Sequence, residues 1–485
     1  MATKHNEPVI IQGGMGVAVS GWELARAVAQ AGQLGVVSGT GLDNVLARRL
    51  QLGDPNGDLR RAMAEFPFPE MAQRVLERYF IPGGKAPDAP FIPVPLLQVP
   101  FSQERLELLV IANFVEVYLA KEHHDGLVGV NYLEKIQIPT LPSLYGAMLA
   151  GVDYVLMGAG IPRAIPGVLD KLAHGEAVEL PFYVVGAERD DNYVTRFDPR
   201  AFTGDRLPWI RRPKFLAIIA SATLATMLAR KATGHVDGFI VEGPTAGGHN
   251  APPRGTLKLN QRGEPIYGAR DEVDLEAIRR LGRPFWLAGS YGDPARVAEA
   301  LEQGAAGVQV GTAFAYCRES GLSSALRQQV LDASARGKLD VLTDPVASPT
   351  GFPFKVVSLS GSLSDAAVYE QRHRVCDLGY LRHAYKRPDG TIGWRCAAEQ
   401  IDAYLGKGGT LEETCGKKCV CNALLANIGL GQVRNGNVEK PLVTSGDDAR
   451  DVAHFLEVSG GSSYNAADVI QFLLSGVEVA CAEPV

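Results

Sequence analysis

The chain has 485 residues, of which 46% are hydrophobic and 21% are charged, and its formal net charge is −6. This composition is typical of a globular protein with a large apolar core. The acidic balance argues against nucleic acid as the main partner, because binding through phosphate neutralisation needs a basic face. The longest apolar stretch, residues 108–120, is interrupted by Asn113 and Glu116, so no membrane span is predicted. No signal peptide is recognised at the N-terminus, and we expect a cytoplasmic protein.

Strand and helix signals alternate along the first two-thirds of the chain, which predicts a parallel α/β fold. A first strand is expected at residues 9–12, a helix at 21–31 and a second strand at 35–38. Residues 92–99 carry prolines and are predicted to form an edge strand or a distorted one. Further strands are expected at residues 127–130, 154–157, 215–219, 238–241, within 284–288, and at 307–310.

Two segments interrupt this alternation, as the length requires, because a plain (β/α)8 barrel needs only about 250 residues. Residues 43–84 have a helical, amphipathic pattern that is broken at 54–57 and at Pro67 and Pro69, which indicates an elaborated crossover after the second strand. Residues 186–213 are polar, with prolines and aromatic residues, and are interpreted as a surface insertion near the active face.

A glycine pair and a histidine follow the predicted buried strand at residues 238–241. Gly247 and Gly248 can adopt backbone angles that other residues avoid, and they allow a flat ligand to approach the main chain closely. His249 comes directly after them, at a strand-to-loop turn where general acid–base groups of parallel α/β enzymes tend to lie. Its neighbours in sequence are small, so we expect the imidazole to point into a cavity.

Two later turns have the composition of a phosphate site. Gly289 and Gly292 follow one buried strand and precede a helix that should begin at Asp293, while Gly311 and Thr312 follow the next strand. Turns of this kind expose unpaired backbone N–H groups, and barrels commonly bind phosphate after the seventh and eighth strands. The ordered pair of turns behind His249 is a stronger signal than either turn alone.

The character of the chain changes near residue 344. Residues 344–354 are rich in turn-forming residues and are predicted not to be helical. The segment beyond them contains Cys376, Cys396, Cys415, Cys419 and Cys421. Paired Cys-x-x-Cys motifs are missing and no histidine is nearby in sequence, so we expect reduced thiols and no metal, although a metal or a cluster is the alternative.

Four motifs, at residues 10–16, 243–249, 288–292 and 309–314, follow one another in a characteristic order. In these motifs the chain resembles the nitronate monooxygenase family, formerly called 2-nitropropane dioxygenases. These proteins are barrels that bind flavin mononucleotide (FMN), and they also include flavin-dependent enoyl reductases and quinone reductases. The chain has Thr245 where the family usually has glutamate, and Glu242 where it usually has glutamine. The tail is similar to that of longer flavin barrels related to the trans-acting enoyl reductases of polyketide and polyunsaturated fatty acid synthases.

This resemblance implies an FMN-binding (β/α)8 TIM barrel at residues 1–342, with helical insertions at 43–84 and 186–213. A mainly helical extension at residues 343–485 would pack beside the mouth of the flavin site. The resemblance also implies that His249 faces the substrate above the flavin, as a base or as a donor to a developing anion. Gly14, Met15 and Gly16 would pass close to the flavin ring, and the phosphate would bind at Gly289, Gly292, Gly311 and Thr312.

The sequence leaves three functions open. The first is oxidation of alkyl nitronates by molecular oxygen without a nicotinamide. The second is NAD(P)H-dependent reduction of an enoyl thioester, which requires an acyl carrier protein as partner. The third is a non-catalytic flavin-binding scaffold, which the two phosphate turns and His249 disfavour. The physiological substrate and the oligomeric state are not determined by the sequence.

Overall fold

A computed structural model of the protein describes residues 7–204, 206–475 and 477. The first six residues, part of the N-terminus in which no signal peptide is recognised, lie outside the described residues, as do the last residues of the predicted tail. No helix in the described part of the chain is long and apolar enough to cross a membrane.

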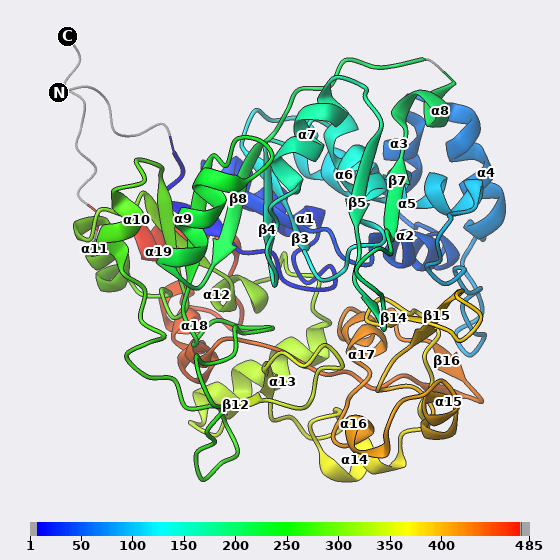
Figure 1. Ribbon diagram of the computed structural model, residues 1–485. Helices are drawn as coiled ribbons and strands as arrows, with labels where there is room; N and C mark the ends of the chain where they lie inside the picture. Colours follow the sequence, from blue (N-terminus) through cyan, green and yellow to red (C-terminus); the bar gives the residue numbers. More distant parts are fainter. Residues whose placement is uncertain (1–6, 205, 476, 478–485) are drawn as a thin grey trace.

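Eight parallel strands form one sheet in the order β1-β11-β10-β9-β8-β4-β3-β2. The sheet closes on itself, because the amide of Leu34 donates to the carbonyl of Ile10 (3.1 Å) and the amide of Gln12 donates to the carbonyl of Leu34 (3.0 Å). The prediction of a TIM barrel is therefore confirmed (Figure 1). The barrel strands are β1 (Ile10–Gln12), β2 (Gly35–Ser38), β3 (Val128–Leu133), β4 (Tyr154–Gly158), β8 (Lys214–Ile219), β9 (Gly238–Glu242), β10 (Phe285–Ala288) and β11 (Gly307–Val310).

Side chains of the barrel strands alternate between two apolar layers, as the pleat of a strand requires. On β8, Phe215 packs in the large cluster that includes the surrounding helices, while the next residue, Leu216, belongs to a small inner cluster. Trp286 of β10 lies in the same inner cluster, and its indole N–H donates to the carbonyl of Pro8 (2.8 Å). The strands are thus buried on both sides, which explains why they are recognised in the sequence as nearly continuous apolar runs.

Helices surround the barrel, and the one that closes the ring comes from the end of the chain. α19 (Ala466–Leu474) packs against α1 (Trp22–Gln30) and α11 (Pro294–Glu302), beside β1 and β11. The tail therefore leaves the barrel after β11 and returns to it at α19, so the division at residue 342 stays a prediction. The other helices up to β12 are α5 (Gln103–Lys121), α6 (Thr140–Leu149), α7 (Ile165–Ala173), α9 (Ala222–Lys231), α10 (Leu275–Arg279), α12 (Thr312–Ala315) and α13 (Ser324–Ala335).

The segments between the barrel elements differ from expectation in one place. Residues 43–84 form three helices with breaks where they were predicted: α2 (Leu42–Gln51), α3 (Asp58–Ala64) and α4 (Pro69–Tyr79). The predicted strand at residues 92–99 is wrong, because this segment is irregular. Its prolines cannot donate to a β-ladder, and of its side chains only Val94 and Leu97 are buried. The second predicted insertion, residues 186–213, contains β7 (Val194–Phe197) and α8 (Pro199–Thr203), and it is preceded by β5 (Val178–Pro181) and β6 (Val184–Val185).

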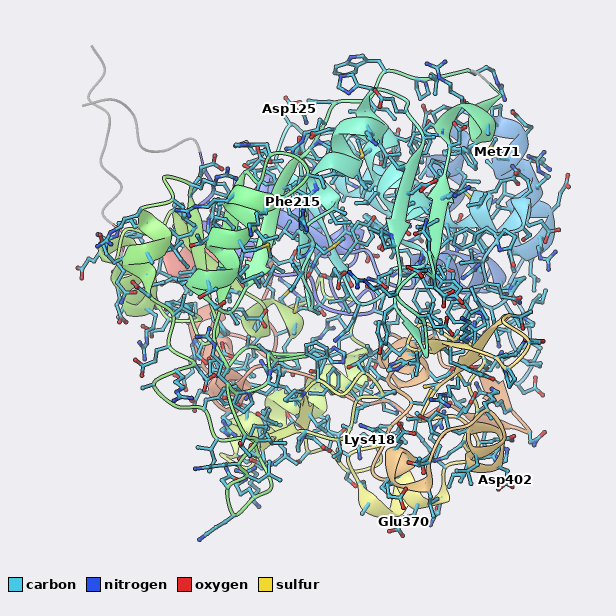
Figure 2. All side chains as sticks on the ribbon, in the orientation of Figure 1. Met71, Asp125, Phe215, Glu370, Asp402 and Lys418 are labelled. Atoms are coloured by element: carbon cyan, nitrogen blue, oxygen red, sulfur yellow. The ribbon has the colours of Figure 1, made fainter. Side chains whose placement is uncertain are left out.

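Short helices and strands follow the barrel and cover one end of it, in the lower half of Figure 1. Figure 2 places Phe215 in the barrel half and Glu370 and Asp402 at the far edge of the tail. These elements are β12 (Val341–Asp344), β13 (Phe354–Val357), α14 (Ala366–Gln371), β14 (His383–Lys386), β15 (Ile392–Arg395), α15 (Ile401–Gly406), α16 (Leu411–Thr414), α17 (Val420–Asn427), β16 (Val433–Arg434), β17 (Asn437–Val438), the 3-10 helix η1 (Asp447–Asp451) and α18 (His454–Ser459).

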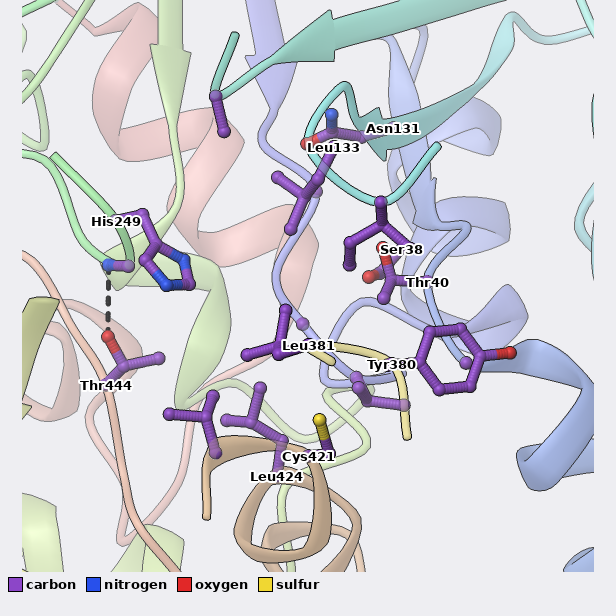
Figure 3. A pocket seen from close by; sticks show the side chains of 18 of the residues that line it. Ser38, Thr40, Asn131, Leu133, His249, Tyr380, Leu381, Cys421, Leu424 and Thr444 are labelled. Carbon is purple, nitrogen blue, oxygen red and sulfur yellow. Dashed lines mark hydrogen bonds between the residues drawn. The ribbon is translucent and has the colours of Figure 1, made fainter. Parts of the chain in front are cut away.

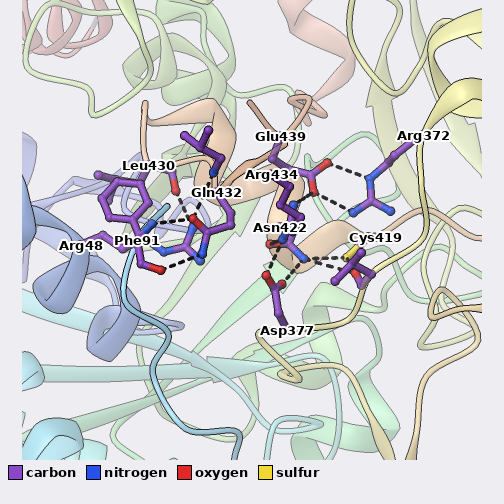
Figure 4. Close-up of polar contacts among 12 residues, drawn as sticks. Arg48, Phe91, Arg372, Asp377, Cys419, Asn422, Leu430, Gln432, Arg434 and Glu439 are labelled. Carbon is purple, nitrogen blue, oxygen red and sulfur yellow. Dashed lines mark hydrogen bonds and ion pairs between the residues drawn. The ribbon is translucent and has the colours of Figure 1, made fainter. Parts of the chain in front are cut away.

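Buried polar contacts hold the tail on the barrel. The guanidinium of Arg48 on α2 donates to the carbonyl of Leu430 at 2.6 Å, beside the contacts drawn in Figure 4. Gln432 exchanges two hydrogen bonds with the backbone of Phe91 (2.7 and 3.0 Å). Because an unpaired buried polar group is costly, these contacts fix the position of the tail as well as its attachment.

A fully buried ion pair lies at the same boundary and leads to a stability prediction. Arg105 of α5 pairs with Asp43 of α2, and both side chains are at most 3% exposed. The hydroxyl of Tyr380, from the tail, also donates to Asp43. Asp43→Ala should destabilise the protein by about 3–5 kcal/mol, because it leaves a buried guanidinium uncompensated. The surface pair of Arg78 and Glu104 provides the control: Glu104→Ala should cost no more than about 1 kcal/mol in urea unfolding. Equal effects would contradict the prediction.

Candidate functional site

Two overlapping cavities open at the carboxyl ends of the barrel strands. Both are lined by Gly14, Glu242, Gly247 and Gly248, and they enclose about 1100 and 990 Å³ of space between the protein atoms, including adjoining solvent. The residues after β1, β9, β10 and β11 meet here because these strands are neighbours in the sheet. This is the end at which barrels of this type carry their active sites.

The turn after β1 brings bare backbone to the cavity. A Cβ atom on Gly14 would lie 2.4 Å from the Cβ of Asn131 on β3, so no other residue fits there. The turn is held in place by the Ser20 hydroxyl, which accepts from the amide of Met15 at 2.7 Å. The cavity therefore has a wall of main-chain atoms against which a flat molecule can lie.

His249 lies at the edge of the first cavity, across from Tyr380 (Figure 3). Its Nε2 is 2.7 Å from the hydroxyl oxygen of Ser348, and its ring is 4.7 Å from that of Phe354. The sequence predicts an imidazole with few neighbours, but two tail residues pack against it. Burial, together with the positive charge of Lys135, holds the pKa of His249 well below its usual value, so the ring is neutral at pH 7.

A buried pair of ionisable groups lies near His249. Glu242, at the end of β9, lines both cavities, and burial raises the pKa of its carboxyl to about 7. The ammonium of Lys135, just after β3, is buried without a hydrogen-bond partner and lies 4.4 Å from the centre of the Phe352 ring. Burial lowers the pKa of Lys135 to about 7, and Glu242 opposes that shift. The site therefore holds two groups that can change protonation near neutral pH.

The two predicted phosphate turns line the second cavity, together with part of the tail. Gly289 has a φ of +105°, which favours glycine, and it lies beside Gly311 and Thr312 in the lining. The tail reaches the same place: the amide of Gly446 donates to the Thr312 hydroxyl at 3.1 Å. The carboxyl of Asp448 also lines this cavity. The phosphate turns are thus enclosed by residues that follow them by more than a hundred positions.

The residues that line the second cavity fit the ring portion of a flavin. Main-chain atoms of the turns after β1 and β9 offer a flat surface, and the side-chain oxygen of Gln309 on β11 is enclosed in the same cavity with no hydrogen-bond partner. A free acceptor of this kind is expected where a ligand supplies the missing donor. The phosphate end is compatible only if the Asp448 carboxyl is neutral, because a carboxylate would repel a phosphate.

Most of the residues that the sequence singled out are brought together. Of the nine expected to bind the cofactor, eight line the second cavity, while Gly292 lies behind it, where an added Cβ would be 3.2 Å from an Asp448 oxygen. The missed residues are of two kinds. Lys135 follows a buried strand and could have been found by that position. Thr444, Asp448, Phe354 and Tyr380 come from the tail and have no local signal.

Four of the cysteines form a group beside the cavity. Cys376, Cys396 and Cys419 pack together, and Cys421 lines the first cavity, while Cys415 is exposed. These five cysteines are free thiols in the structure. Among residues 7–204, 206–475 and 477, no group of three or more Cys, His, Asp or Glu side chains is arranged to hold a metal ion.

The sequence prediction of reduced thiols can be tested on the purified protein, which we expect to contain no stoichiometric metal. Titration with a thiol reagent under denaturing conditions should recover all seven cysteines of the chain as free thiols. About one zinc per chain by elemental analysis, or the visible absorbance of an iron–sulfur cluster, would contradict this expectation.

The closed parallel sheet and its surrounding helices define the chain as a (β/α)8 barrel. Its glycine-rich turns and His249 surround a cavity at the carboxyl ends of the strands, where barrels of this class bind their ligands. Residues 210–346 match the family model described as nitronate monooxygenase. This segment runs from just before β8 to β12 and includes His249 and both phosphate turns. Over this segment, the second half of the barrel, the chain is similar to the nitronate monooxygenase family.

Individual relatives match over the same limited length. The chain is 31% identical over 138 residues to a nitronate monooxygenase of Pseudomonas aeruginosa, which is 28% of this chain and 38% of that protein. It is 33% identical over 142 residues, 29% of this chain, to a (3aS,4S,5R,7aS)-5-hydroxy-7a-methyl-1-oxo-octahydro-1H-indene-4-carboxyl-CoA dehydrogenase of Mycobacterium tuberculosis, covering 35% of that protein. The chain therefore spans little more than a third of the length of these curated relatives.

Among solved structures, the chain is similar to that of FabK from Thermotoga maritima. It superposes with a TM-score of 0.47 and 16% sequence identity, over 97% of this chain and 92% of that one.

Proposed function

We propose that the protein is an FMN-dependent oxidoreductase that oxidises alkyl nitronates with molecular oxygen. The observation that carries this proposal is the position of His249, a neutral imidazole at the edge of a cavity lined by glycine-rich turns and by apolar side chains of the tail. The family match over residues 210–346 supports the same class of reaction. A small-molecule substrate fits the enclosed space.

Each group of residues has a role in this proposal. The turns with Gly14, Met15 and Gly16 and with Gly247 and Gly248 would hold the flavin ring, and the turns at Gly289, Gly311 and Thr312 would hold its phosphate. When bound, the flavin supplies the electron-accepting ring, while the protein orients the substrate and moves protons.

His249 would take the proton from a carbon acid. If Nε2–H donates to Ser348, whose hydroxyl is in turn 2.8 Å from that of Thr350, the lone pair of Nδ1 is left to accept a proton. The low pKa of His249 keeps this base in its active form at pH 7 and below.

The second candidate function is NAD(P)H-dependent reduction of an enoyl thioester carried by an acyl carrier protein. A further cavity, lined by Leu97, Phe182 and Trp394, adjoins the first one, with Ile136, Tyr380 and Leu381 in both linings. This mostly apolar cavity, between the turn that joins β5 to β6 and the tail, would suit an acyl chain. The cavity therefore supports an acyl substrate, as the second candidate requires, but it gives no support for NAD(P)H as the reductant.

One set of assays separates the two candidates. Oxygen consumption with propyl-2-nitronate and no nicotinamide is expected for the first. Oxidation of NADH or NADPH that depends on a crotonyl thioester, without nitronate turnover, would establish the second instead. Extraction and chromatography of the bound cofactor should yield FMN, and a different flavin would contradict the cofactor assignment.

The positive charge of Lys135 near His249 predicts how kcat/KM depends on pH. Lys135→Met removes a positive charge that lowers the pKa of His249, so that pKa should rise toward its usual value. Because the base is active only when deprotonated, kcat/KM for a carbon acid should then fall at a higher pH on the acid side than in the wild type. Lys338→Met, at an exposed position, should leave the pH profile unchanged. An identical acid limb in Lys135→Met and the wild type would contradict the role of Lys135.

A further inference from the structure

Asp448 places an acidic side chain at the predicted phosphate site, where a carboxylate would repel the ligand. It lies in η1 of the tail and lines the cavity formed by the turns at Gly289, Gly311 and Thr312. One of its oxygens would be 3.2 Å from a Cβ on Gly292, and the other is enclosed without any hydrogen-bond partner. An enclosed carboxyl oxygen with no donor is costly as an anion and is expected to be paired or neutral.

The backbone on both sides of Asp448 is pinned, so the side chain remains at the turns. The amide of Asp447 donates to the carbonyl of Thr245 at 3.0 Å, and that of Gly446 donates to the Thr312 hydroxyl at 3.1 Å. Ala449, the next residue, is fully buried. The tail also contacts the flavin-facing turn, because the Thr444 hydroxyl accepts from the amide of Gly248 at 3.0 Å.

Burial is the largest influence on Asp448 and raises the pKa of its carboxyl. The Thr312 hydroxyl and the backbone amide of Asp448 oppose this shift, while the charges of Asp447 and Asp451 in the same element add to it. Arg450, also in this element, pairs with Asp447 (3.5 Å). Asp447 is itself paired with Lys355, whose ammonium is 2.8 Å away. The groups that face Asp448 from the packed elements are the phenols of Tyr316 and Tyr464, whose pKa values are also raised by burial.

We propose that Asp448 is part of the cofactor site and binds the flavin phosphate as a neutral acid, donating its proton to a phosphate oxygen. The inference rests on the proposed flavin site and adds a residue from outside the barrel to it. Since the phosphate of FMN is a dianion above about pH 7, ionised Asp448 would repel it. The affinity for FMN should therefore fall as the pH rises, by up to about tenfold per pH unit once the carboxyl ionises, because one proton must be taken up on binding.

Riboflavin provides the matched ligand, because it has the same ring and no phosphate. Dissociation constants of FMN and riboflavin for the apoprotein are measured by quenching of flavin fluorescence between about pH 7 and 8.5. We expect the FMN constant to rise with pH and the riboflavin constant to stay flat. Calorimetry of FMN binding to the wild type in two buffers of different ionisation enthalpy should show uptake approaching one proton at the upper end of this range.

Two variants complete the test. Asp448→Asn should flatten the pH dependence for FMN and bind it more tightly than the wild type at pH 8.5. Asp451→Asn, which removes a neighbouring exposed charge, should keep the wild-type slope. Equal pH slopes for FMN and riboflavin in the wild type, or no proton uptake, would overturn the role of Asp448 and leave the flavin site intact. Failure of both ligands to bind would overturn the flavin site and this inference together.

Discussion

Replacement of His249 by alanine is expected to lower turnover of a carbon acid by about a hundred- to ten-thousand-fold, the usual cost of losing a positioned general base. The neutral imidazole, held at Nε2 by Ser348 and packed at a tilt against Phe354, is suited to accept a proton at the cavity edge. The loss should be smaller on a nitronate supplied as the anion, because its carbon is already deprotonated. Steady-state rates on a nitroalkane and on its nitronate measure the contrast.

The control for this variant is His235→Ala, since the side chain of His235 is 65% exposed and away from the lining of the cavities. It should leave both rates unchanged. His249→Ala should keep its flavin and lose no more than about 2 kcal/mol of stability, since it removes one hydrogen bond and one ring contact. Equal losses on both substrates would indicate anion binding by the ring instead of proton transfer. Unchanged turnover would remove His249 from the mechanism.

Replacement of Gly311 by aspartate is expected to abolish flavin retention. The turn after β11 lines the cavity beside Thr312, and a carboxylate there would stand against the phosphate in a partly dry site, where like charges repel by several kcal/mol (about 4 kcal/mol at 4 Å). The loss is measured as the ratio of flavin absorbance to protein absorbance after purification.

Gly311→Ala is the matched control, because a Cβ at this position would meet only Met15 atoms at 3.7 Å, an ordinary contact. The backbone at Gly311, with φ of −111°, also accepts other residues. The alanine variant should therefore keep its flavin. Full flavin occupancy in the aspartate variant would remove the phosphate assignment, whereas loss in both variants would show that the turn does not tolerate any side chain.

The barrel itself was determined by local sequence. Each barrel strand is a short apolar run bounded by turn residues, and burial on both sides makes such runs conspicuous. Asp293 caps α11 as predicted, since its side chain accepts from the amide of Ala295, and Pro294 occupies the first turn. The glycine-rich turns were also recognised from local sequence, because glycine occurs where the backbone adopts angles that other residues avoid. The order of these turns then placed them at one end of the barrel.

The tertiary structure alone decided what encloses the site. Four residues reach the cavities from the tail, up to about two hundred positions after the turns they contact: Phe354, Tyr380, Thr444 and Asp448. Ser348, also from the tail, contacts His249. No periodicity or motif specifies such contacts, because they depend on complementary shape and on buried hydrogen bonds formed after the barrel exists. For the same reason the sequence gives no local signal that α19 closes the barrel from the end of the chain. The local pattern therefore specified the elements and their turns, while long-range packing determined which side chains complete the site.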